Sequence, residues 1–126
     1  MADPQPRTLF DKIWDRHLVQ APGADGIPGV LYIDLHLLHE VTSPHGFAEL
    51  EERNLQVRSP SRTLATMDHS TPTDSGITLE KLRVLDAAGA AQLEKLARNC
   101  ETHGIPLYGL GSDRRGIVHV MAPELG

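Results

Sequence analysis

Imidazole and carboxylate side chains that could exchange protons gather at three places along this sequence. The first is segment 32–47, YIDLHLLHEVTSPHGF, where five proton-handling or hydrogen-bonding side chains fall within eight positions: His36, His39, Glu40, Thr42 and Ser43. The second is the pair Asp68-His69, and the third is His119 with Glu124 shortly after it. A carboxylate beside an imidazole fixes its tautomer and raises its basicity, so such pairs suit acid–base catalysis.

Predicted strands and helices alternate along the chain. Apolar runs predict short strands at 30–34, 63–68, 106–110 and 116–122. Capped or amphipathic segments predict helices at 8–18, 43–53 and 78–103. This alternation indicates an α/β fold with a mostly parallel sheet. The polar, Pro/Gly-rich segments 20–29 and 70–77 are predicted to be flexible loops.

The predicted helix at 78–103 carries one apolar stripe. Its members recur at spacings of three and four: Leu82, Leu85, Gly89, Leu93, Leu96 and Cys100. Gly104 is expected to cap the helix, and Pro106 prevents its continuation. Cys100 is the single cysteine, and its place on the stripe predicts a buried thiol without chemistry. One cysteine can neither form an internal disulfide nor by itself hold an iron–sulfur cluster.

Composition narrows the class of protein. A chain of 126 residues with 40% hydrophobic and 23% charged residues fits one soluble globular domain or part of one. The net charge of −5 and the isolated basic pair Arg114-Arg115 argue against nucleic acid. No apolar run approaches the roughly 20 residues of a membrane helix. The first residues lack the apolar core of a secretion signal, so a cytoplasmic location is expected.

The positions just after strands are the main candidates for functional residues, because ligands of open α/β sheets bind beyond the carboxyl ends of the strands. Asp68-His69 comes directly after the apolar run TLATM, at the carboxyl end of the predicted strand at 63–68, and fits this rule. Ser43, followed by Pro44, is interpreted as a helix N-cap rather than a nucleophile. His36 and His39 could share a metal ion, although HLLHE matches no zinc-protease motif.

Four segments together resemble the large subunit of the 3-isopropylmalate dehydratases, within the aconitase superfamily. They are RTLFDKIWDRH, LYIDLHLLHEVTSP, TLATMDH and GIVHVMAPELG, and RNCETHGIPLY lies between the last two. The resemblance covers nearly the whole chain. It implies that residues 1–126 form the N-terminal portion of an aconitase-like α/β/α domain, as a fragment of a longer subunit.

The resemblance also implies a reaction. These enzymes are hydro-lyases of leucine biosynthesis that interconvert 2-isopropylmalate and 3-isopropylmalate through 2-isopropylmaleate. A 4Fe–4S cluster held by three cysteines assists the loss of hydroxide, and a separate small subunit completes the heterodimer. The cluster cysteines are expected beyond Gly126, so no metal ligand is expected within this chain, which alone should be inactive.

Residue roles follow from the same resemblance. His69 is expected to be the catalytic acid, with Asp68 as its orienting partner, and His119 a second catalytic histidine. The HEVTSP segment is expected to bind the substrate through four side chains: His39, Glu40, Thr42 and Ser43. Thr42 and Ser43 could donate hydrogen bonds to a carboxylate at a helix N-terminus.

Three alternatives stay open from the sequence. The first is a homoaconitase-type hydro-lyase subunit, because such enzymes share much of this pattern. The second is a stand-alone, non-catalytic α/β module derived from the family. The third is a small zinc hydrolase that uses His36, His39 and His69.

Overall fold

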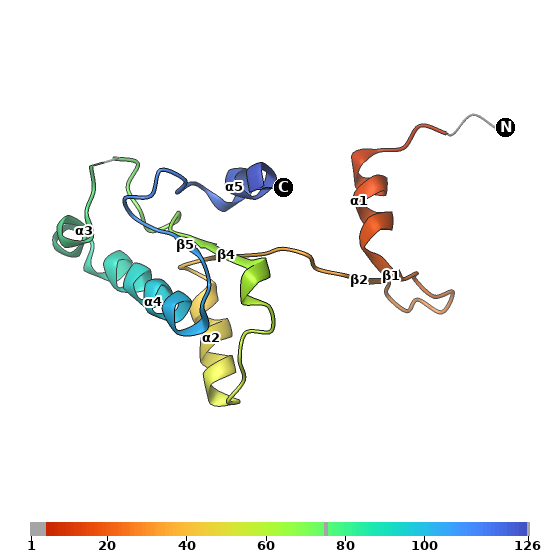
Figure 1. The fold of residues 1–126 in the computed structure, drawn as a ribbon, viewed down its shortest axis with the longest axis horizontal. Helices are drawn as coiled ribbons and strands as arrows, with labels where there is room; N and C mark the ends of the chain where they lie inside the picture. The colour runs from red at the N-terminus through yellow and green to blue at the C-terminus, as the bar shows by residue number, and fades with distance from the viewer. Residues whose placement is uncertain (1–4, 75, 126) are drawn as a thin grey trace. The chain divides into compact units, whose positions relative to one another are not determined.

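The computed structural model describes residues 5–74 and 76–125, which fall into two compact units (Figure 1). One unit ends at Asp34 and the other begins at Leu35. In the described part of the chain, no helix combines the length and apolarity needed to cross a membrane.

The first unit consists of a helix and a short antiparallel hairpin. Helix α1 (Leu9–His17) begins at Thr8, whose hydroxyl accepts the Asp11 N–H while the Asp11 carboxylate accepts the Thr8 N–H. This reciprocal cap confirms the helix predicted at 8–18. Strand β1 (Leu18–Gln20) pairs with β2 (Val30–Leu31), and residues 21–29 form the connecting loop.

The strand predicted at 30–34 is therefore wrong in extent. Only Val30–Leu31 is extended in a ladder, and it is an exposed antiparallel strand. Ile33 follows the strand and is 68% exposed. The apolar run does not enter the parallel sheet, because the residues that pair there lie a few positions later.

The second unit is built on a three-stranded parallel sheet, which confirms the α/β class. Its strands are β3 (His36–His39), β4 (Thr63–Thr66) and β5 (Leu107–Tyr108), in the order β3-β4-β5. In register, His39 lies opposite Thr66, and Thr66 lies opposite Tyr108. A short 3₁₀ turn, η1 (Pro60–Arg62), leads into the central strand β4. Helix α2 (Ser43–Glu52) follows β3 after a short turn.

The helix predicted at 78–103 is two helices, α3 (Leu79–Leu85) and α4 (Ala87–His103). Asp86 separates them, and its side chain caps α4 by accepting the Gly89 N–H. The break takes Leu85 off the predicted stripe and leaves it 74% exposed. Gly104 ends α4 in the left-handed conformation at φ 66°, as predicted.

The strand predicted at 116–122 is also wrong, because Val118–Leu125 forms helix α5. Two contacts with the end of β4 explain this. The Thr66 hydroxyl donates to the Gly116 carbonyl at 2.9 Å, and the Asp68 carboxylate accepts the Val118 N–H at 2.9 Å. A carboxylate at this position stabilises a helix N-terminus, so the β-branched run starts a helix instead of joining the sheet.

The core of the second unit lies between the sheet and helices α2, α3 and α4. Its buried members include Ala65 on the sheet and Leu82, Leu93, Leu96 and Cys100 on the helices. Burial raises the pKa of the Cys100 thiol to about 11, which keeps it protonated and unreactive. The prediction of a buried thiol is confirmed. Of the predicted loop at 70–77, Ser75 lies outside the described residues and the other positions have no helix or strand.

The split between α3 and α4 predicts opposite outcomes for two leucines of the predicted stripe. We expect Leu93→Ala to lower the free energy of unfolding by about 2–5 kcal/mol, because Leu93 is completely buried. Leu85→Ala should change it by less than about 0.5 kcal/mol, because that side chain is largely in solvent. Urea denaturation of the two variants measures both values. Equal losses would contradict the break at Asp86.

Candidate acid–base site

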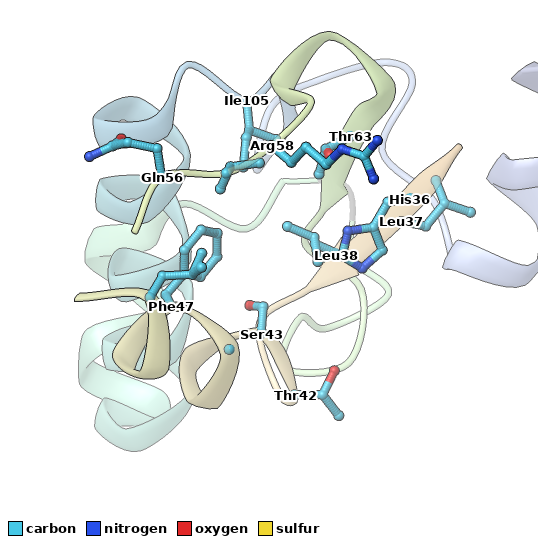
Figure 2. Close-up of a pocket in the computed structure, with 13 residues that line it drawn as sticks. His36, Leu37, Leu38, Thr42, Ser43, Phe47, Gln56, Arg58, Thr63 and Ile105 are labelled. Atoms are coloured by element: carbon cyan, nitrogen blue, oxygen red, sulfur yellow. The ribbon is translucent and has the colours of Figure 1, made fainter. Parts of the chain in front are cut away.

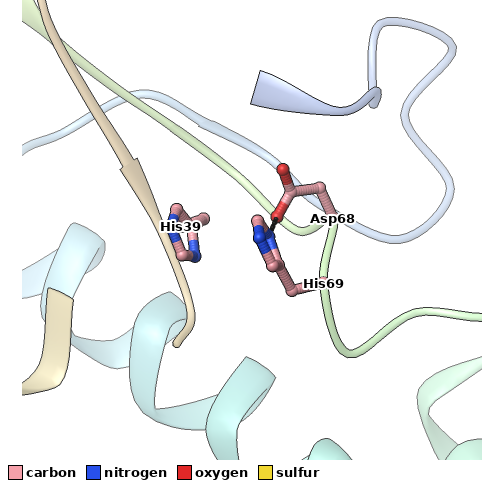
Figure 3. A group of neighbouring side chains, drawn as sticks. All are labelled: His39, Asp68 and His69. Atoms are coloured by element: carbon pink, nitrogen blue, oxygen red, sulfur yellow. Dashed lines mark hydrogen bonds and ion pairs between the residues drawn. The ribbon is translucent and has the colours of Figure 1, made fainter. Parts of the chain in front are cut away.

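The carboxyl ends of β3 and β4 bring His39, Asp68 and His69 together (Figure 3). One ligand-type atom from each of the three side chains lies within 4.8 Å of the others. His39 is the last residue of β3, and Asp68-His69 begins two residues after β4 ends. Parallel strands end at the same edge of a sheet, so two distant sequence segments meet here.

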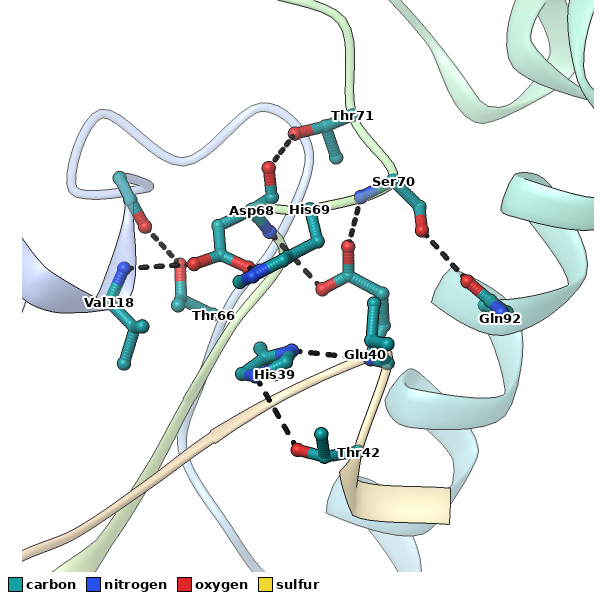
Figure 4. A network of polar contacts seen from close by, with 12 residues as sticks. His39, Glu40, Thr42, Thr66, Asp68, His69, Ser70, Thr71, Gln92 and Val118 are labelled. Atoms are coloured by element: carbon teal, nitrogen blue, oxygen red, sulfur yellow. Dashed lines mark hydrogen bonds and ion pairs between the residues drawn. The ribbon is translucent and has the colours of Figure 1, made fainter.

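Asp68 is the buried centre of this group. Its side chain is only 1% exposed, and both of its oxygens are engaged (Figure 4). One oxygen accepts a short hydrogen bond from Nδ1 of His69, and the other accepts the Val118 N–H at the start of α5. The carboxylate therefore fixes Nδ1 of His69 as the protonated nitrogen of the neutral ring and leaves Nε2 as the second proton-exchanging atom.

The His69 ring is partly exposed to solvent, and its Nδ1 is hydrogen-bonded to the buried Asp68 carboxylate. Its side chain is 41% exposed. The hydrogen bond to Asp68 raises the pKa of His69 above its ordinary value, and the negative charges of Asp68 and Glu40 add to this rise. An imidazole that stays protonated at higher pH and faces solvent is suited to donating a proton.

Glu40 holds the backbone around this pair. It is completely buried, and its carboxylate accepts the N–H groups of Asp68, at 3.2 Å, and of Ser70. The Ser70 hydroxyl in turn donates to the side-chain oxygen of Gln92 on α4 at 2.8 Å. Residues 68–70 are thus bonded on one side to Glu40, which follows β3, and on the other to α4.

His39 lies flat against His69. The two ring centroids are 4.1 Å apart and the ring planes differ by 13°. Nδ1 of His39 accepts the Val41 N–H at 3.3 Å, which places its proton on Nε2, 3.4 Å from the Thr42 hydroxyl. Both nitrogens of His39 therefore face the start of α2.

The other predicted histidines lie elsewhere. His119 is the second residue of α5 and is exposed, so it is placed by the contact between Asp68 and Val118. His36 begins β3 and lies three residues before His39. Because side chains alternate between the two faces of a strand, His36 and His39 are on opposite faces. Among the described residues, the group that could share a metal contains His39 and His69 but not His36. The set expected for a zinc hydrolase is not assembled.

A cavity of about 510 Å³ lies between β3, α2 and residues 56–58 (Figure 2). Its walls are mainly apolar, with a few polar side chains: His36, Thr42, Ser43, Gln56, Arg58 and Thr63. None of the described residues that line it is acidic. The Ser43 hydroxyl is buried at this wall without a hydrogen-bond partner in the described structure.

Ser43 is not the helix cap that the sequence suggested. The N-cap of α2 is Thr42, in a helical conformation and without a side-chain bond to the helix, and Ser43 is the first helical residue. The Thr42 hydroxyl lies next to His39 instead. Pro44 stands in the first turn, as expected.

Sequence reasoning missed two polar side chains that shape this site. Thr66 is completely buried within β4 and holds the segment before α5 through the Gly116 carbonyl. Gln92 anchors the loop at Ser70. The signal for Thr66 was a hydroxyl inside the apolar run TLATM, where a buried polar group needs a partner. Gln92 gave no such signal, because it sits among polar residues of a long helix.

The residues of this chain do not fit the role of iron–sulfur ligands. A cluster of the expected kind needs three thiolates, and the sequence contains one cysteine. That cysteine is 2% exposed in the apolar core, where its thiol is protonated. The chemistry available here is therefore that of imidazole, carboxylate and backbone groups.

Comparison with known proteins gives one consistent family. Residues 11–126 match the aconitase family (aconitate hydratase). The chain is 61% identical over 121 residues to the 3-isopropylmalate dehydratase large subunit of Roseiflexus castenholzii, covering 96% of this chain and 25% of that protein. It is 53% identical over 122 residues to the large subunit of Anaeromyxobacter dehalogenans, covering 97% of this chain and 25% of that protein.

A third relative gives the same coverage. The large subunit of Listeria monocytogenes is 47% identical over 120 residues, which are 95% of this chain and 24% of that protein. No solved structure matches the chain. The chain thus spans about a quarter of the length of these relatives, in agreement with the resemblance to part of a large subunit.

The buried position of Glu40 predicts a loss of order in the loop that carries His69. In Glu40→Gln, an amide NH₂ would face one of two backbone N–H donors, so we expect a loss of about 1–3 kcal/mol in the free energy of unfolding. Amide hydrogen exchange at Asp68 and Ser70 should also become faster. Glu49→Gln, at a largely exposed position on α2, is the matched control and should leave both measurements unchanged.

The contact with Asp68 predicts a shift in the titration of His69. In Asp68→Asn the pKa of His69 should fall toward its ordinary value of 6.5, because the hydrogen-bonded charge is gone. Titration of the imidazole by NMR measures this. The pKa of His17, which is raised mainly by its hydrogen bond to Asp34, should stay raised and serves as the control.

The raised pKa of His69 also predicts how the free energy of unfolding depends on pH, and Asp68→Asn tests this. Because the pKa of His69 is raised on folding, its protonation stabilises the fold fully below the ordinary pKa, and this contribution disappears as the pH rises through the folded-state pKa. The stability difference between wild type and Asp68→Asn should therefore be larger on the acid side of that window. A difference that grows with pH would contradict the assignment.

Proposed function

Because this chain belongs to the aconitase family, we propose that it forms the acid–base wall of a hydro-lyase active site. The proposed enzyme is a 3-isopropylmalate dehydratase, of which this chain is part of the large subunit, acting on 2-isopropylmalate and 3-isopropylmalate. The observation that carries the proposal is the solvent-facing imidazole of His69 held by the buried carboxylate of Asp68. The names and identities of the relatives support the same reaction.

The chemistry of dehydration gives His69 its role. Removal of water breaks a C–O bond on one carbon and a C–H bond on the next, and the electron pair of the C–H bond becomes the double bond. Hydroxide is a poor leaving group, so its oxygen must receive a proton as it departs. Protonated His69 delivers that proton from Nε2, and a base takes the proton from carbon. Readdition of water with the two positions exchanged reverses these transfers and gives the isomer.

Asp68 acts through His69 and not on the substrate. Its carboxylate orients the ring through Nδ1 and favours the protonated form that donates. Through its other oxygen it also places the start of α5, which carries His119. We propose that His119 is the second active-site histidine of the pair implied by the family resemblance.

The start of α2 is proposed to receive a substrate carboxylate. The Ser43 hydroxyl is buried without a partner at the cavity wall, and the positive end of the helix dipole favours an anion there. Thr42 joins this cavity to the histidine pair, because it lines the cavity and contacts His39. His39 and Glu40 were also predicted to bind substrate, but their polar atoms are engaged within the chain, so we assign both to holding the site.

The proposal for the whole protein includes components outside this chain. They are the 4Fe–4S cluster with its cysteine ligands, which would polarise the substrate hydroxyl, and the small subunit that completes the heterodimer. The family and the large-subunit names of the relatives support both in general terms.

The test is an assay of the full-length large subunit together with its small subunit. Formation of 2-isopropylmaleate from either isomer, followed by its ultraviolet absorbance, measures turnover. We expect His69→Ala to lower kcat by about 10²-fold or more, because general acid catalysis contributes at least that factor. Glu101→Ala, at an exposed position near the end of α4, is the control and should retain wild-type kcat.

Two outcomes would defeat this proposal. One is near-normal turnover in His69→Ala. The other is a wild-type enzyme that leaves both isopropylmalates unchanged. Assay with homoaconitate in parallel separates the homoaconitase-type alternative, which predicts preference for that longer substrate.

A further inference from the structure

His39 touches His69 with the face of its ring and not with a nitrogen. The near-parallel planes, 13° apart at a centroid separation of 4.1 Å, define a stacked pair (Figure 3). The nitrogens of His39 point along its own ring plane, toward Val41 and Thr42 in the turn before α2. The ring face is therefore the part of His39 that His69 meets.

We propose that His39 is a positioning residue, which holds the His69 ring by stacking so that Nδ1 meets Asp68 while Nε2 faces the substrate. This inference rests on the proposed function of His69 as the acid. It assigns His39 a role that neither substrate binding nor metal ligation requires.

Stacking supplies a constraint that Asp68 alone does not. The hydrogen bond to Asp68 fixes one atom of a side chain that is 41% exposed, and the ring could still swing about that atom. A flat surface against the ring removes this freedom. The gain matters for proton transfer, because a misplacement of about 1 Å can cost roughly 10²-fold in rate.

The charges around the pair favour the same arrangement. Asp68 and Glu40 both place negative charge near His69, which favours the protonated form of that ring. Nδ1 of His39 accepts the Val41 N–H, which requires a lone pair on that nitrogen. A neutral ring face beside a cation is attractive, whereas two stacked cations would repel.

The geometry disfavours a shared metal ion at these side chains. In-plane nitrogen lone pairs of two nearly parallel rings run side by side and do not converge on one point. Both oxygens of Asp68 already accept hydrogen bonds. A metal ion would require the stack to open.

The experiment compares two variants of His39 in the full-length large subunit assembled with its small subunit. One replaces the imidazole with an aromatic ring that has no nitrogens, and the other replaces it with a polar side chain that has no ring. His39→Phe keeps the flat face, and His39→Gln keeps polar atoms but loses the face. We expect His39→Phe to retain kcat within about threefold, and His39→Gln to lower kcat by about tenfold or more with KM little changed. The alkaline limb of the kcat profile should move to lower pH in His39→Gln alone, because the imidazolium loses its neighbour.

A second measurement does not depend on turnover. In wild type and His39→Phe, the aromatic neighbour should shift the His69 ring signals in the NMR spectrum, and this ring-current shift should vanish in His39→Gln. Thermal unfolding checks that each variant is folded, and His39→Leu replaces His39→Gln if the latter is not. Zinc titration of the wild-type protein tests the metal alternative directly.

The inference is overturned if His39→Phe is as damaging as His39→Gln, since that would assign the role to the nitrogens. A rise in KM at constant kcat in both variants would assign His39 to substrate binding instead. Wild-type kcat in His39→Gln would also overturn it. An inactive wild-type enzyme would defeat the proposed function alone, and the ring-current comparison would still decide whether His39 positions His69.

Discussion

Two buried carboxylates, Asp68 and Glu40, are the constraint on which the rest of the site depends. An ionised acid removed from water is costly unless its oxygens receive hydrogen bonds, so each carboxylate dictates where its donors must be. Glu40 fixes the backbone at Asp68 and Ser70, and Asp68 fixes both the His69 ring and the first turn of α5. The orientation of the proposed acid and the course of the chain 50 residues later are therefore set by one set of bonds.

The sequence predicted the features that depend on residues close together in the chain. The α1 cap at Thr8, the left-handed Gly104, the central strand and the position of Asp68-His69 at a strand end all follow from patterns within a few residues. The errors lie where distant partners decide. Segment 116–122 has the composition of a strand, but the contacts of its start with the end of β4 make it a helix. The apolar run at 30–34 stays outside the parallel sheet because β4 pairs with 36–39 instead.

Side-chain roles at the site were harder to predict than side-chain positions. His39 ends β3 and Glu40 follows it, and both contact the segment that carries Asp68 and His69. Whether a polar atom faces a ligand or another part of the chain depends on burial, which a residue pattern does not contain. Glu40 is completely buried, and it serves the backbone of the neighbouring loop. Ser43 is the converse case, with a buried hydroxyl that lacks a partner at a cavity wall.

The bonds that orient His69 all come from elements within the second unit, namely β3, the loop after β4, α4 and the start of α5. The proposed proton donor is thus oriented by side chains of this unit, and in the proposed enzyme the electrophile would come from another part of the protein. Such a division suits a dehydration, in which the leaving oxygen needs both a proton and a partner for its lone pairs. Cys100, the single thiol, lies in the core of the same unit and contributes packing there.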